Sequence, residues 1–124
     1  MASVFMMNLA PEKKNLLQVL SFRLNFACVE ISPQQQSCVI GDLLSGSASA
    51  KPSGKPFRDE MIIMDGLENE SLDFLLNEMA RTGNTVPLKA VTTPTNIHWT
   101  LSMLYYKILE ENRAMHQKSR EAVR

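Results

Sequence analysis

The chain has 124 residues, 44% of them hydrophobic, and its 13 basic residues balance its 13 acidic ones. This length and apolar content suit a single compact domain, residues 1–124, with one core. A net charge of zero excludes the strongly basic surface that attracts nucleic acids, so we expect no nucleic-acid partner. No segment approaches the roughly 18 consecutive apolar residues of a membrane span, and the first ten residues lack a basic leader. We therefore expect a cytoplasmic protein without membrane contact.

The residues that commonly carry chemistry are sparse. Cys28 and Cys38 do not form a Cys-x-x-Cys pair, so we expect reduced thiols and no zinc ribbon or other metal site. The five glycines are scattered, which excludes a phosphate-binding Walker loop and a dinucleotide fingerprint. His98 and His116 stand without a marked nucleophile. We therefore predict a protein that is not an enzyme and has no cofactor.

The first third of the chain predicts a strand–helix–strand unit. Residues 4–9, VFMMNL, form a short apolar run typical of a strand buried on both faces. Pro11 suits the first turn of a helix that runs to about Asn25. Its apolar positions recur at helical spacing, at Leu16, Leu17, Leu20 and Leu24. Residues 27–32 then alternate, with Val29 and Ile31 on one side, as in a half-exposed strand.

A long connection follows. Residues 38–44, CVIGDLL, predict a short accessory element, and the pattern leaves open whether it is a strand or a helix. Residues 45–56, SGSASAKPSGKP, contain too few apolar side chains to be held in place, so we expect a mobile internal loop. Its length is compatible with a functional loop and with a disordered linker.

The strand–helix–strand unit then recurs. Residues 61–64, MIIM, predict a fully apolar strand, followed by a turn at Asp65 and Gly66. Asn69 is a suitable N-cap for a helix that Gly83 ends. The apolar stripe of this helix consists of Leu72, Leu75, Leu76 and Met79. Residues 87–93 alternate as a second half-exposed strand.

Two such units predict an α+β fold, the ferredoxin-like βαββαβ sandwich with antiparallel strands in the order 4-1-3-2. In that order the first and third strands are central and the others are edges. The first and third predicted strands are apolar on both faces, whereas the second and fourth alternate, as this arrangement requires. A truncated, doubly wound parallel sheet is the alternative, but it does not by itself explain that difference.

An additional C-terminal helix is predicted from about Leu101, with Thr100 as its N-cap. Its stripe consists of Leu101, Leu104, Tyr105 and Ile108, and residues 116–124 should form a fraying tail. In a ferredoxin-like sandwich, the helices of the two repeats cover one sheet face only. Because the central strands are apolar on both faces, we expect this helix and a homodimer of C2 symmetry to share the second face.

The stretch KAVTTPTNIHWT, residues 89–100, is the best candidate for a site. On one reading it is a structural corner, in which Pro94 ends the strand, Trp99 fills the core and Thr100 caps the helix. On the other, polar groups converge on a small anion such as a carboxylate or phosphate. The tentative ligand-binding residues are then Lys89, Thr95, Asn96 and His98.

The segment LKAVTTPTNIHWTLSMLYYKILEENRAM resembles a small bacterial family of uncharacterised domains, domain-of-unknown-function family 3783. The resemblance covers about residues 57–115. The positions that carry it are Lys89, Ala90, Thr93, Pro94, Thr95, Asn96, Trp99 and Thr100. Met103 departs from the pattern, since the family often has an acidic residue there that would complete a capping box with Thr100. The resemblance implies membership only and no activity.

These observations lead us to predict a cytosolic interaction or regulatory module that acts as a homo-oligomer. The alternative is a binding or catalytic domain for a small anion or metabolite, with its site at the corner of residues 89–100. A bound anion on two of the tentative residues would favour the alternative.

Overall fold

The computed structural model describes residues 2–46 and 55–122, with the side chains of 114–122 excepted. Its elements are, in chain order, β1 (Ala2–Met7), α1 (Pro11–Leu24), β2 (Phe26–Glu30), the 3-10 helix η1 (Pro33–Ser37), α2 (Ile40–Ser45), β3 (Met61–Asp65), α3 (Asn69–Arg81), β4 (Leu88–Val91), the 3-10 helix η2 (Asn96–His98) and α4 (Leu101–Ala122). Most of the loop predicted at residues 45–56 lies outside the described residues. The accessory element is a helix, α2.

The four strands form one mixed sheet in the order β2-β1-β3-β4. Each strand–helix–strand unit places its two strands side by side and parallel, β1 with β2 and β3 with β4. The units meet where β1 pairs antiparallel with β3. The predicted ferredoxin-like order, 4-1-3-2 with antiparallel strands, is therefore wrong, although the two repeated units and the additional C-terminal helix are present.

The error has a physical reason. The burial pattern of a strand indicates whether it is central or at an edge, and β1 and β3 are indeed central. Both strand orders have that property. The two orders differ in where the second strand of each unit lies. In the observed order it is next to the first strand of its unit, whereas in the ferredoxin-like order one strand of the other unit lies between them. Apolar alternation carries no information on that choice, because the same faces are buried in either case.

The two units match each other position by position. A residue in the left-handed region ends each first strand, Asn8 with φ 60° and Gly66 with φ 74°. The helix begins three residues later in both, at Pro11 and at Asn69. Leu17 and Leu75, equivalent in this alignment, are both completely buried. The two halves are thus structural repeats with few identical residues.

The helices α1 and α3 cover one face of the sheet. Alternate residues of the central strands point to this side, including Val4 and Met6 of β1 and Ile62 and Met64 of β3. They pack against the inward leucines of α1 and α3. This core consists of Val4, Met6, Leu9, Leu17, Leu20, Phe26, Ile62, Met64, Leu75, Met79 and Val86.

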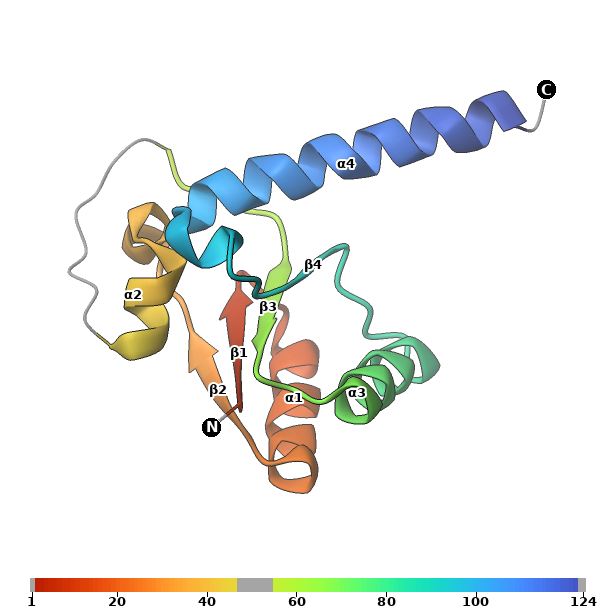
Figure 1. Ribbon diagram of the computed structural model, residues 1–124. Coiled ribbons are helices and arrows are strands. Elements are labelled where there is room, and N and C mark those ends of the chain that lie inside the picture. Colours follow the sequence, from red (N-terminus) through yellow and green to blue (C-terminus); the bar gives the residue numbers. More distant parts are fainter. Residues whose placement is uncertain (1, 47–54, 123–124) are drawn as a thin grey trace.

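The other face is covered by α4 together with α2 and Phe57. Figure 1 shows α4 crossing the body of the protein, with its C-terminal half extending beyond it. This second core consists of Phe5, Met7, Ile31, Ile40, Phe57, Met61, Ile63, Leu88, Leu101, Leu104, Tyr105 and Ile108. As a result, residues 4–7 and 61–64 are at most 3% exposed within one chain. The predicted helical lid is present, and this face needs no second copy to hide it. The homodimer itself stays a prediction.

Phe57 anchors the chain where it re-enters the domain ahead of β3. The buried Gln36 amide pairs with its backbone, since Gln36 Oε1 accepts the Phe57 N–H at 2.9 Å and Nε2 donates to the Phe57 carbonyl at 3.3 Å. The Phe57 ring stacks on Tyr105 of α4, with centroids 4.0 Å apart and planes inclined by 2°. Asn8 Nδ2 also donates to the Phe57 carbonyl, at 3.0 Å. One residue thus joins η1, α4 and the turn after β1.

A partly buried ion pair ties the start of α1 to β3 and to the approach to β4. Glu60 accepts from the Ala10 N–H at 2.9 Å and forms a hydrogen-bonded ion pair with Lys13. Lys13 Nζ also donates to the Thr85 carbonyl at 2.7 Å. Desolvation alone would raise the pKa of Glu60, but the Lys13 and Ala10 hydrogen bonds and the Lys13 charge together lower it below its ordinary value.

The lid function of α4 can be tested by two substitutions within the same helix. Leu101→Ala removes a completely buried side chain and should lower the free energy of unfolding by about 2–5 kcal/mol. Met103→Ala removes an exposed side chain and should change it by about 0.5 kcal/mol or less. Urea denaturation of both variants measures the difference. Equal effects would show that α4 is not packed on the sheet.

Glu60→Gln tests the ion pair. Because the folded-state pKa of Glu60 is lowered, its stabilisation is present above the unfolded-state pKa, about 4.3, and is lost as the pH falls through the folded-state pKa. The stability difference between wild type and Glu60→Gln should therefore be largest at neutral pH and shrink below about pH 4. Denaturant titrations between pH 3 and 7 measure it. Glu110→Gln, at an exposed position of α4, is the control, and an equal pH dependence there would contradict the assignment.

Candidate functional site

The corner of residues 89–100 begins where β4 ends beside β3. The Thr92 N–H donates to the Met64 carbonyl at 3.1 Å, which continues the pairing one residue beyond β4. The Thr92 hydroxyl donates to the carboxylate of Asp65, the last residue of β3. The chain therefore leaves the sheet at Thr93, with the ends of both strands tied together.

Asn96 holds the turn that follows. Its Oδ1 accepts the Thr93 N–H at 2.8 Å, while the Thr93 hydroxyl accepts the Asn96 N–H at 3.0 Å. Its Nδ2 donates to the Val91 carbonyl at 3.0 Å. Asn96 is buried, and both the oxygen and the nitrogen of its side-chain amide form hydrogen bonds with the backbone of its own turn. This residue closes the corner and does not present its amide to a ligand.

The far side of the corner is joined to the segment between η1 and α2. Val39 and Thr100 form an antiparallel bridge, with hydrogen bonds from the Ile40 N–H to the Trp99 carbonyl and from the Leu101 N–H to the Cys38 carbonyl. The predicted N-cap is confirmed, because Thr100 Oγ1 accepts the Met103 N–H at 3.2 Å. The start of α4 is therefore joined both to the corner that contains η2 and to the segment between η1 and α2.

Gly41 permits this contact. A Cβ atom at Gly41 would lie 3.0 Å from the Ile97 carbonyl oxygen, closer than most Cβ atoms approach a neighbour, so a side chain there would push the two segments apart. Sequence reasoning missed the pairing between residues 38–41 and the corner. The available signal was the glycine in CVIGDLL, since an isolated glycine often marks a close backbone approach.

Trp99 is partly buried and packs against the core under α4, where the sequence predicted a largely buried side chain. Pro94 is exposed at the turn, and so are Thr95 and His98. Among the hydrogen bonds of the corner, Thr95 and His98 take part through their backbone, from the His98 N–H to the Thr95 carbonyl at 3.3 Å. Of the tentative ligand-binding residues, Thr95 and His98 thus present a hydroxyl and an imidazole at the surface of the corner.

Lys89 lies on the opposite face of the sheet from the corner. It pairs with Ile62, whose side chain points to the α1 and α3 side, whereas its neighbours Leu88 and Ala90 point to the α4 side. Its Nζ donates to the Val86 carbonyl at 2.9 Å, next to α3. The structure therefore does not bring Lys89 together with Thr95, Asn96 and His98. The tentative site of four residues is not assembled.

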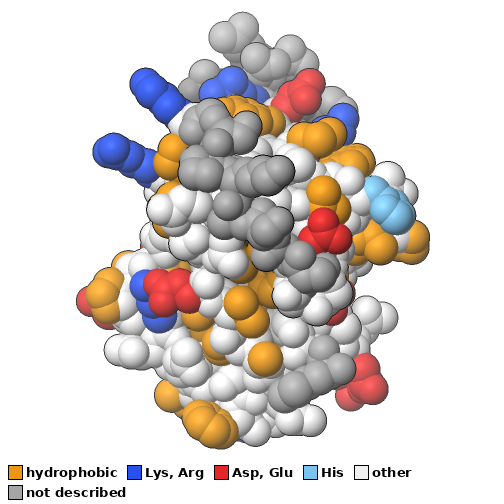
Figure 2. All heavy atoms as spheres, turned by 90° about the vertical axis from the view of Figure 1, so that its left-hand side faces the viewer, with side chains coloured by type: hydrophobic (Ala, Val, Ile, Leu, Met, Phe, Trp, Pro, Cys, Tyr) orange, Lys and Arg blue, Asp and Glu red, His pale blue; other side chains and the backbone are white. Residues whose placement is uncertain are grey.

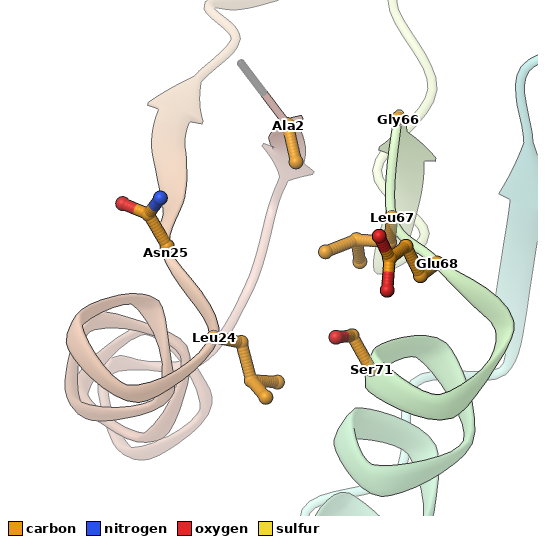
Figure 3. A pocket seen from close by; sticks show the side chains of 7 residues that line it. All are labelled: Ala2, Leu24, Asn25, Gly66, Leu67, Glu68 and Ser71. Atoms are coloured by element: carbon orange, nitrogen blue, oxygen red, sulfur yellow. The ribbon is translucent and has the colours of Figure 1, made fainter.

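A cavity of about 320 Å³ lies between the end of α1 and the start of α3 (Figure 3). It is lined by Ala2, Leu24, Asn25, Gly66, Leu67, Glu68 and Ser71. Figure 3 shows Leu67, Glu68 and Ser71 directed toward Leu24 across the space, while the Asn25 side chain points away. The polar part is one exposed carboxylate and one hydroxyl on the same wall. The sequence signals for this place, Gly66 and Asn25, indicated turns and no cavity.

Within residues 2–46 and 55–122 no group of three His, Cys, Asp or Glu side chains lies close enough to hold a metal ion. In the same part of the chain no helix is long and apolar enough to cross a membrane.

The fold and the corner define a small mixed α/β domain built from two repeated βαβ units. Residues 60–115 match the family model described as "Domain of unknown function (DUF3783)". The matched segment contains β3, α3, β4, the whole corner and the first part of α4, and it supports the resemblance to a family of unknown function. No curated protein and no solved structure matches the chain.

The structural role of Asn96 can be tested directly. Asn96→Ala leaves the Thr93 N–H and the Val91 carbonyl without their partner and should lower the free energy of unfolding by about 1–3 kcal/mol. Thr95→Ala, one residue away and exposed, should change it by about 0.5 kcal/mol or less. Thermal and urea denaturation of the two variants give the comparison. If Asn96→Ala is as stable as Thr95→Ala, the turn is held by other contacts.

Proposed function

We propose that this domain is a cytoplasmic protein-interaction module that acts as a homo-oligomer, and that it is neither an enzyme nor a nucleic-acid-binding protein. One observation carries the proposal: large apolar side chains stand on the outward faces of two helices. Phe22 is 89% exposed and Val19 67% on α1, and Tyr106 is 62% exposed and Met103 55% on α4. Such side chains grouped on a helix surface are typical of contact sites between proteins.

The small-ligand alternative draws less support from the corner. Asn96 is used within its own turn, and Lys89 lies across the sheet, which leaves Thr95 and His98 as the exposed candidates. A site for an anion usually combines several donors that converge on one point. Two surface side chains with no third partner are a weak anchor for a carboxylate or phosphate.

The fold limits the surfaces on which a protein partner could bind. Both faces of the sheet are covered within one chain, so a partner has to meet the outer side of the covering helices or an edge strand. On the side where α2 and β2 lie, Figure 2 shows hydrophobic side chains in small separate groups among other side chains and backbone. That mixture is ordinary for a protein surface. The outward faces of α1 and α4 are more unusual.

Sedimentation velocity between about 1 and 300 µM tests the proposal, because a weak homo-oligomer dissociates within a range of this kind. We expect the weight-average sedimentation coefficient to rise with concentration and to approach that of a dimer. Intact mass measured beforehand serves as the control for covalent linkage through Cys28 or Cys38. A coefficient that stays at the monomer value over the whole range would refute the homo-oligomer.

A further inference from the structure

The two repeats supply an internal reference for the exposed face of α1. In the alignment that matches Leu17 with Leu75, the outward positions Val19 and Phe22 of α1 correspond to Asn77 and Ala80 of α3. All four are exposed. The same place in the fold thus carries a polar or small side chain in one repeat and large apolar side chains in the other. The requirements of the fold alone do not explain Val19 and Phe22.

Large apolar side chains lie on two opposite sides of α1. Its inward side carries Leu17 and Leu20 in the core, and its outward side carries Val19 and Phe22. In α3 the apolar residues gather on the inward side. Large apolar side chains that stand exposed on the side of a helix away from the sheet are typical of a second contact.

We propose that the α1 outer face, formed by Glu12, Asn15, Val19, Phe22 and Arg23, is the contact surface of a homodimer in which two α1 helices pack antiparallel about a two-fold axis beside Val19. This inference rests on the proposed function and names the surface that it uses. In this arrangement Val19 meets Val19 of the second copy, and Phe22 packs near Leu16 of the second copy.

Charge favours a second copy of this chain as the occupant. Glu12 lies in the first turn of α1 and Arg23 in the last, on the same side as Val19. With the axis beside Val19, the rise of 1.5 Å per residue places Glu12 about 4.5 Å along the helix from Arg23 of the other copy. Glutamate and arginine side chains span that offset. The two-fold axis forms this opposite-charge pair twice, at both ends of the contact.

The structure also positions Arg23 for this role. Its guanidinium carbon lies 4.7 Å from the centre of the Phe74 ring on α3, so the side chain is held against the helix layer. An arginine held in this way loses less side-chain entropy when it pairs with a carboxylate. Phe74 itself is partly buried and packs against the core beneath α1 and α3.

The size of the surface predicts a weak dimer. A helix of 14 residues is about 21 Å long, and one of its faces offers less than the roughly 800 Å² per partner of a stable interface. A two-fold contact uses each apolar side chain of the patch twice, which a contact with an unrelated protein does not. We expect a dissociation constant in the micromolar range.

The double variant Val19→Asn/Phe22→Ala gives α1 the outward residues of α3 and tests the surface. We expect the dimer dissociation constant, measured by sedimentation velocity, to rise about tenfold or more. The fold should remain intact by circular dichroism, since both side chains are exposed. The same measurement on Met103→Ala/Tyr106→Ala tests the other exposed apolar pair, which lies on α4. An unchanged dissociation constant there supports the α1 surface, whereas a larger loss than in Val19→Asn/Phe22→Ala overturns it.

Charge exchange tests the antiparallel arrangement. Glu12→Arg and Arg23→Glu should each weaken the dimer, and the double variant should restore it, because each copy then offers the reversed pair. A double variant as weak as the singles overturns the arrangement. If the wild type dimerises and Val19→Asn/Phe22→Ala does so equally well, the α1 surface is wrong while the proposed function stands. A wild type that is monomeric throughout refutes both.

Discussion

The structure depends on the burial of both faces of β1 and β3. Their side chains at residues 4–7 and 61–64 are at most 3% exposed, although the helices of the two repeats cover one face only. A sheet with one bare apolar face would aggregate or stay incompletely folded, so the chain needs a second layer. Residues outside the two repeats supply it, because α2, Phe57 and α4 cover the second face.

The corner of residues 89–100 connects the sheet to this second layer and fixes the position of α4. Asn96 satisfies the backbone groups of the turn, Thr100 caps α4, and the bridge to Val39 draws α2 and the start of α4 together. The polar side chains of Asn96 and Thr100 thus have a structural role in the corner. A lid helix can be positioned accurately only if the turn before it has one conformation, and buried hydrogen bonds of the Asn96 type provide that.

Much of this architecture could be predicted from residues whose signals are local. The leucine spacing of α1 and α3, the cap at Thr100 and the alternation around Lys89 all have a single physical reading, and the structure agrees with each. The strand order could not be predicted, because it depends on which strand each helix returns to, and no side chain records that. The four tentative residues were grouped by their nearness in sequence, and the structure separates Lys89 from the other three. Lys89 and Asn96 are near in sequence, but side chains alternate between the two faces along a strand, and the Lys89 side chain lies on the opposite face of the sheet.

The antiparallel junction between β1 and β3 separates the two places where an α/β protein usually binds small molecules. Ligands of such folds lie beyond the carboxyl ends of parallel strands, in the crevice where neighbouring connections diverge. Here the strands β1 and β2 run in one direction and β3 and β4 in the other, so the carboxyl ends of the two pairs lie at opposite ends of the sheet along the strand direction. The turns at Asn8 and Gly66 are therefore separated by the length of a strand, roughly 17 Å. A molecule of metabolite size reaches one turn or the other, so the two repeats do not share one crevice, and of these two ends the cavity of about 320 Å³ lies at the one with Gly66.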